Sequence, residues 1–104
     1  MTLSHDSAAI LETHVLLAWK SSERGYLHGA IDCDKFMGHP RHAVDLLLAP
    51  YVFRHRNANN NLKIRDYVGK LDAYCNHESL SQESEEAFLN LFTELHDYLS
   101  QNYS

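Results

Sequence analysis

Apolar residues recur every three or four positions in four stretches of the chain, which is the spacing of one face of an α-helix. No stretch of useful length shows the alternation of apolar and polar residues that is typical of a half-buried strand. The pattern therefore predicts an all-α fold, a compact single domain over residues 1–104 with four to five short, bundle-like helices. The four predicted helices cover about residues 6–24, 40–53, 61–75 and 81–99.

The first predicted helix is apolar on more than one face. Ile10, Leu16 and Leu17 widen its apolar stripe, so we expect this helix to be well buried. Asp6 or Ser7 is expected to cap its N-terminus by accepting a hydrogen bond from a free first-turn N–H group. Gly25 is expected to end it, because glycine readily takes the left-handed conformation that follows a helix.

The second predicted helix is apolar nearly all round, as a central helix would be. It opens at Pro40, since proline at the first helical position loses no needed N–H group. Pro50 removes one backbone hydrogen bond and is expected to kink or break the helix, although residues 51–53 continue the apolar pattern. Residues 54–61 are expected to form a polar loop, and residues 26–38 either one short helix or an ordered loop.

The last two predicted helices have the clearest patterns. Asn61 begins the third, and Ser81 is expected to cap the fourth. Glutamates fill the first turn of the fourth helix, where the helix dipole favours negative charge. Its apolar stripe consists of Phe88, Leu91, Phe92, Leu95, Tyr98 and Leu99.

Length and composition place the chain among soluble proteins. The chain has 104 residues, 44% of them hydrophobic, which suffices for a core without disulfides. No apolar run approaches the ~20 residues that cross a bilayer, and residues 1–6 lack the basic and apolar regions of a signal peptide. We therefore expect a cytoplasmic protein without membrane contact, with Cys33 and Cys75 as free thiols.

Charge is unevenly distributed along the chain. Residues 71–104 carry seven acidic residues and no Lys or Arg, a formal charge of −7. Residues 1–70 carry nine basic and seven acidic residues, a formal charge of +2. Surface helices usually mix both signs through pairs four residues apart, so the acidic last third indicates docking onto a basic protein, whose complementary field would speed association.

We therefore expect a non-enzymatic protein-binding domain. In size and charge, and in nothing more specific, the chain is like small inhibitors of nucleases and the bacterial immunity proteins that neutralise toxins. The sequence leaves a homodimer open. The expected contact residues combine steering acids with large aromatic surfaces: Glu85, Glu86, Glu94, Asp97, Tyr98 and Tyr103.

The alternative hypothesis is a nucleic-acid-binding regulator. Five cations lie close together between residues 54 and 70, and the helix from Asn61 would enter the major groove as in a helix-turn-helix. The net charge of −5 opposes this hypothesis, because the acidic last third would repel phosphate. The cations concerned are Arg54, Arg56, Lys63, Arg65 and Lys70.

A third hypothesis is a metal-binding enzyme or sensor. Imidazole, thiolate and carboxylate ligands lie close together between residues 28 and 45. No complete ligand motif is present, so we predict no metal and no other cofactor. The candidate ligands are His28, Asp32, Cys33, Asp34, His39, His42 and Asp45.

Catalytic residues are not predicted. Two pairings, Arg24 with His28 and His55 between Arg54 and Arg56, could supply acid–base chemistry beside a cation. Each is explained as readily by polar residues at a helix end or in a basic loop. The four glycines are scattered, and no nucleophile motif such as GxSxG is present.

Overall fold

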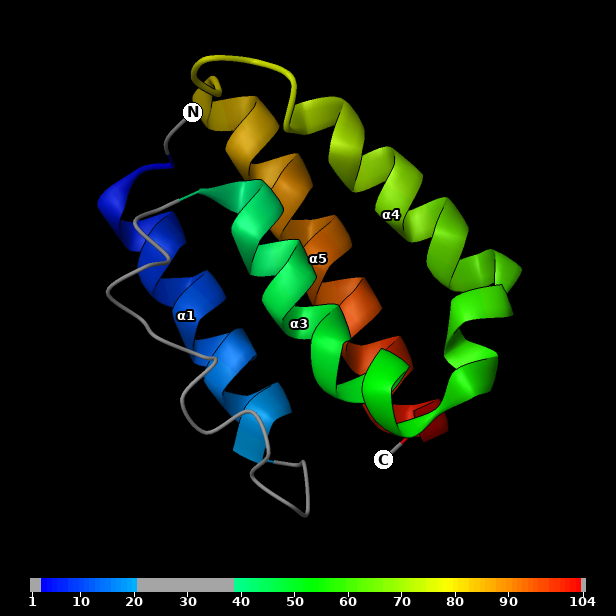
Figure 1. Ribbon diagram of the computed structural model, residues 1–104. Coiled ribbons are helices and arrows are strands. Elements are labelled where there is room, and N and C mark those ends of the chain that lie inside the picture. Colours follow the sequence, from blue (N-terminus) through cyan, green and yellow to red (C-terminus); the bar gives the residue numbers. More distant parts are fainter. Residues whose placement is uncertain (1–2, 21–38, 104) are drawn as a thin grey trace.

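The computed structural model describes residues 3–20 and 39–103, and these residues form helices and turns without a strand (Figure 1). The predicted all-α fold is confirmed. The expected end of the first helix at residues 21–25 and the expected conformation of residues 26–38 lie outside the described residues. The elements are α1 His5–Lys20, α3 Pro40–Arg54, the 3-10 helix η1 Arg56–Asn60, α4 Leu62–Tyr74 and α5 Gln82–Tyr103.

Three of the helices run in the same direction. α1, α3 and α5 begin at the upper end of the bundle in Figure 1 and finish at its lower end, whereas α4 runs the opposite way. α5 is in contact with α1, α3 and α4. The first turn of α4 therefore lies at the lower end, beside the last turns of α5.

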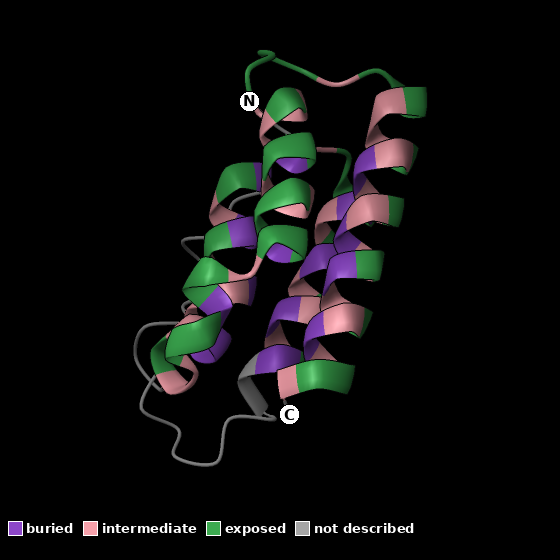
Figure 2. Cartoon of the chain, turned by 90° about the vertical axis from the view of Figure 1, so that its right-hand side faces the viewer, coloured by how far each residue is buried: buried purple, intermediate pink, exposed green. Residues whose placement is uncertain are grey.

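The core takes residues from every described helix. Figure 2 shows the buried positions on the helix faces that turn toward one another. α3 and α5 together supply most of the largest fully buried side chains, and Phe88 of α5 packs against both Phe92 and Tyr74, with ring centroids 6.1 and 6.2 Å apart. The buried apolar residues are Leu11, Val15, Ala18, Ala43, Val44, Leu47, Tyr51, Ala58, Ile64, Leu71, Phe88, Phe92, Leu95 and Leu99.

At the start of three described helices, a side-chain oxygen accepts a hydrogen bond from a backbone N–H group of the first turn. The predicted caps of α4 and α5 are confirmed, since Asn61 Oδ1 accepts from Lys63 N at 2.8 Å and Ser81 Oγ accepts from Ser84 N at 3.2 Å. The predicted cap of α1 is wrong. Ser4 Oγ accepts from Ser7 N at 3.3 Å, so the helix begins earlier than its apolar stripe suggests.

Pro50 does not break α3. The helix continues through it to Arg54, and both Pro50 and Tyr51 are buried. Tertiary packing on each side of the proline thus holds the helical course despite the missing backbone hydrogen bond. The expected polar loop at 54–61 is also wrong, because η1 occupies most of it and Ala58, 1% exposed, anchors it in the core.

α1 is less buried than its composition suggests. Leu11, Val15 and Ala18 face the core, but Ile10 is 45% and Leu17 51% exposed. The expectation that Ile10 and Leu17 widen the buried face is therefore wrong, whereas Leu16 is half-buried. Among the described helices, none combines the length and the apolar character that a bilayer crossing requires.

Candidate functional site

The solvent-facing side of α5 carries an acidic stripe. Its exposed residues are spaced by three or four positions, so they align along one side of the helix. Within the described part of the chain, the only ion pair on this stripe is between Asp97 and the adjacent His96. We call this stripe the α5 outer face: Glu83, Glu86, Asn90, Glu94, Asp97 and Gln101.

Helix dipoles explain part of this acidity but not all of it. Glu83 and Glu86 lie near the beginning of α5, where negative charge is stabilised. Glu94 and Asp97 lie in its second half, beyond the reach of the N-terminal dipole, and the last turn of α5 has no basic residue. These two carboxylates are therefore not accounted for by the stability of their own helix.

Glu85 points away from the α5 outer face and toward α1. Its Oε1 accepts from Ser4 N and its Oε2 from Ser7 Oγ, each at 2.8 Å. Desolvation raises the pKa of Glu85, but the hydrogen bonds from Ser4 and Ser7 outweigh it, and the pKa falls below its usual value. Glu85 thus holds the first turn of α1 against α5, although the sequence placed it among the partner-binding residues.

Tyr98 and Tyr103 lie in an internal network around Asn61. The Asn61 Nδ2 group donates to Tyr98 OH at 2.9 Å and to Tyr103 OH at 2.7 Å. Both tyrosines are half-buried, and Lys63 Nζ lies 4.8 Å from the centre of the Tyr98 ring. One asparagine therefore caps α4 and ties it to the last turns of α5.

The basic residues of the nucleic-acid hypothesis are spread over the end of α3, η1 and α4. Arg56, Lys63, Arg65 and Lys70 are exposed, and Arg54 is half-buried. Lys70 Nζ pairs with Asp66 Oδ2 at 3.2 Å, and Arg65 Nε donates to the Asn59 carbonyl at 3.1 Å. Because Lys63 and Arg65 lie two residues apart on a helix, they do not share a face.

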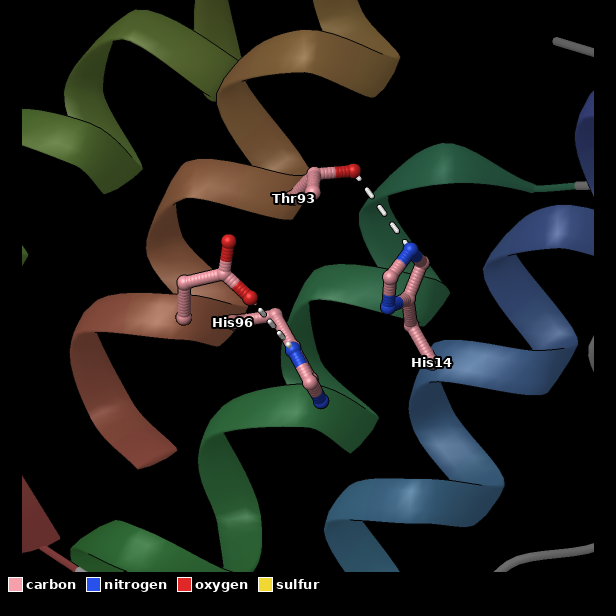
Figure 3. A network of polar contacts seen from close by, with 4 residues as sticks. His14, Thr93 and His96 are labelled. Atoms are coloured by element: carbon pink, nitrogen blue, oxygen red, sulfur yellow. Dashed lines mark hydrogen bonds and ion pairs between the residues drawn. The ribbon is translucent and has the colours of Figure 1, made fainter. Parts of the chain in front are cut away.

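A histidine pair between α1 and α5 escaped the sequence analysis (Figure 3). The His14 and His96 rings lie 4.7 Å apart, His14 Nε2 lies 3.4 Å from Thr93 Oγ1, and His96 Nδ1 lies 3.3 Å from Asp97 Oδ1. Burial lowers the pKa of His14, the nearby His96 lowers it further, and Asp97 opposes them. These surroundings therefore favour an uncharged His14. Through His96 and Asp97, the contact between α1 and α5 is connected to the α5 outer face.

The remaining candidate chemistry is dispersed. The His55 and Tyr103 rings pack together with their centroids 5.4 Å apart, so His55 contributes to packing, whereas the nearby Arg56 is exposed. Burial raises the pKa of the Cys75 thiol, against the effect of Arg41. Arg24 and part of the predicted metal ligands, His28, Asp32, Cys33 and Asp34, lie outside the described residues.

Of the predicted metal ligands that the structure describes, His39 and Asp45 are exposed and His42 is half-buried. In residues 3–20 and 39–103, no three His, Cys, Asp or Glu side chains come together as a metal site would require.

Comparison with known proteins gave no match: no family model, no curated protein and no solved structure is similar to this chain. Any assignment of function therefore depends on the residues and their geometry.

Proposed function

We propose that this protein is a non-enzymatic binding domain that docks onto a basic protein through the α5 outer face. The observation that carries the proposal is the position of Glu94 and Asp97, which are exposed acids well beyond the first turn of α5, where the helix dipole no longer stabilises negative charge. A surface that repeats one sign of charge along a rigid helix attracts lysine and arginine side chains of a partner and raises the association rate.

Glu86, Glu94 and Asp97 are the proposed contact residues from the predicted set. Glu85 is excluded from direct contact, because both of its oxygens are held by α1. The hydroxyls of Tyr98 and Tyr103 both accept from the Asn61 amide, so these side chains hold the end of α5 in place beside the outer face. The specific form of the proposal is an inhibitor of immunity type, whose partner is a basic nuclease.

The test compares two double charge reversals that change the net charge equally. Glu86→Lys with Glu94→Lys alters the α5 outer face, whereas Asp45→Lys with Glu78→Lys alters exposed acids on α3 and in the loop before α5. Both variants are assayed for inhibition of a panel of purified basic nucleases and for binding by surface plasmon resonance. We expect only the first pair to abolish inhibition, with near-wild-type circular dichroism.

The same experiment includes a fluorescent single-stranded and a duplex oligonucleotide. Salt-sensitive oligonucleotide binding that is lost in Arg56→Ala with Lys63→Ala would favour the nucleic-acid alternative. Equal loss of nuclease binding in the two charge-reversal pairs would also contradict the proposal, because it would show an effect of net charge rather than of the α5 outer face.

A further inference from the structure

A groove between α3, η1 and α4 is separate from the α5 outer face. It has a volume of about 360 Å³, within the range typical of small-molecule sites. Its walls are largely apolar, with Leu48 and Val52 from α3 facing Ile64 and Val68 from α4. All the residues that line it belong to α3, η1 and α4, in the part of the chain that the structure describes.

Gly69 keeps one wall of the groove open. It lies in the interior of α4, where glycine costs about 1 kcal/mol relative to alanine. A Cβ atom built on Gly69 would meet nothing within 4 Å, so close packing does not require a glycine here. Gly69 therefore lowers the stability of α4, and its missing side chain leaves free space beside Val68 in the groove wall.

Arg65 places a positioned cation on the same wall. Its Nε donates to the Asn59 carbonyl, and Asn59 also lines the groove. This bond fixes the guanidinium and leaves its terminal N–H groups available for the paired acceptors of a carboxylate. Asp72 lies two turns further along α4, about 10 Å away, where Arg41 Nη2 offsets its charge at 3.5 Å.

We propose that this groove binds a small monocarboxylate with an unbranched apolar body, such as a medium-chain fatty acid. The carboxylate pairs with Arg65, and the apolar chain lies past Gly69 between Val52 and Val68. A single arginine matches a single negative charge. Among the residues that line the groove, Arg65 is the only cation, so the second charge of a phosphate dianion would have no counter-charge in the wall.

The experiment is a methyl NMR titration of the full chain with octanoate, with octylammonium as the probe of opposite charge. We expect saturable shifts at Leu48, Val52, Ile64 and Val68 with octanoate only. Gly69→Leu fills the open wall and should weaken binding at least tenfold, whereas Gly69→Ala is the matched control that adds one methyl group and improves helix propensity. Arg65→Gln should weaken octanoate binding, and Arg65→Lys should restore part of it because it keeps the charge.

Three results from the wild type and Gly69→Leu would overturn the proposal. They are the absence of saturable shifts, equal shifts with octylammonium, and unchanged binding in Gly69→Leu. If Gly69→Leu lowers the helical signal in circular dichroism, the Arg65→Gln variant tests the proposal instead. The Arg65 side chain is exposed, so replacing it leaves the core intact. Unchanged octanoate binding in Arg65→Gln would equally contradict the proposed site.

Discussion

At the scale of single residues, neighbouring glutamates of α5 have different roles. Glu85 is held by Ser4 and Ser7, whereas Glu86, one position further on, is exposed to solvent. Successive residues of a helix are separated by about 100°, so one step along α5 moves a carboxylate from the contact with α1 to the outer face. The sequence shows three glutamates in one turn but not which of them reaches another helix.

Glu85→Gln should lower the free energy of unfolding by about 1 kcal/mol at neutral pH, because it weakens the charge-assisted bonds at the start of α1. The folded-state pKa of Glu85 lies below its unfolded value. Its contribution is therefore present above the unfolded pKa of about 4.3 and is lost as the pH falls through the folded value. Urea denaturation between pH 7 and pH 3 measures both effects.

Glu86→Gln is the matched control for this prediction. It removes the same charge from an exposed position without a partner among the described residues, and should leave stability within about 0.5 kcal/mol. Equal effects of the two substitutions would show that the bonds to Ser4 and Ser7 contribute nothing.

His14 makes the α1–α5 contact sensitive to pH. Its pKa is lowered in the folded state, so the unfolded chain takes up the proton more readily. Stability is highest above the unfolded pKa of about 6.5 and should fall as the pH drops from there through the folded value. His14→Gln should reduce the change in the urea denaturation midpoint between pH 7.5 and pH 5. His5→Gln, at an exposed position, should leave this pH dependence as it is in the wild type.

At the scale of elements, Asn61 joins α4 to α5. Asn61→Ala removes the cap of α4 and the bonds to Tyr98 and Tyr103, so we expect a loss of about 1–2 kcal/mol. Asn60→Ala, on an exposed neighbour, is the control and should be nearly neutral. Denaturant unfolding compares them, and a loss in Asn61→Ala no larger than in Asn60→Ala would contradict the role of this network.

The sequence predicted the elements better than it predicted their contacts. Caps such as Asn61 and Ser81 are local, because a side chain bonds the backbone two or three residues ahead. The continuation of α3 through Pro50 depends on packing from other helices, which no local pattern contains. The histidine pair joins α1 to α5, and the two residues come together only when both helices have packed, so spacing along the chain could not reveal it.

The same limit applies to the candidate sites. The acidic residues of α5 were evident from composition, and their exposure follows from the helical period. The involvement of Tyr98 and Tyr103 in the Asn61 network was not predictable, since aromatic residues in an apolar stripe suit a core, an interface or a polar network equally well. The groove beside Gly69 needs the relative position of α3 and α4, which the sequence does not specify.

At the scale of the whole molecule, charge follows the direction of the helices. Glu83 lies near the upper end of the bundle, with Asp6 in the first turn of α1, whereas Arg54 ends α3 and Lys63 begins α4 at the lower end. The upper end contains three helix N-termini, so the acids there agree with the helix dipoles, whereas Lys63 in the first turn of α4 opposes the dipole of its helix. A partner approaching in solution experiences this field before any contact forms.

If the field steers a basic partner, raising the salt concentration should slow association more than it speeds dissociation. The screening length falls from ~10 Å at 0.1 M to ~3 Å at 1 M salt. Stopped-flow measurements on wild type and on Glu86→Lys with Glu94→Lys should show a steep salt dependence of the association rate only in the wild type. A salt-independent rate in the wild type would contradict electrostatic steering.

The central position of α5 has a consequence for synthesis. A ribosome adds residues at ~5–20 per second, and α5 is the last helix to emerge, although Phe88, Phe92, Leu95 and Leu99 complete the core for all the others. For several seconds the nascent chain therefore presents the apolar faces around Leu11 and Leu47 without the helix that covers them. Chaperones that bind exposed apolar segments would meet this protein during that interval, and the core can close only after α5 has left the ribosome.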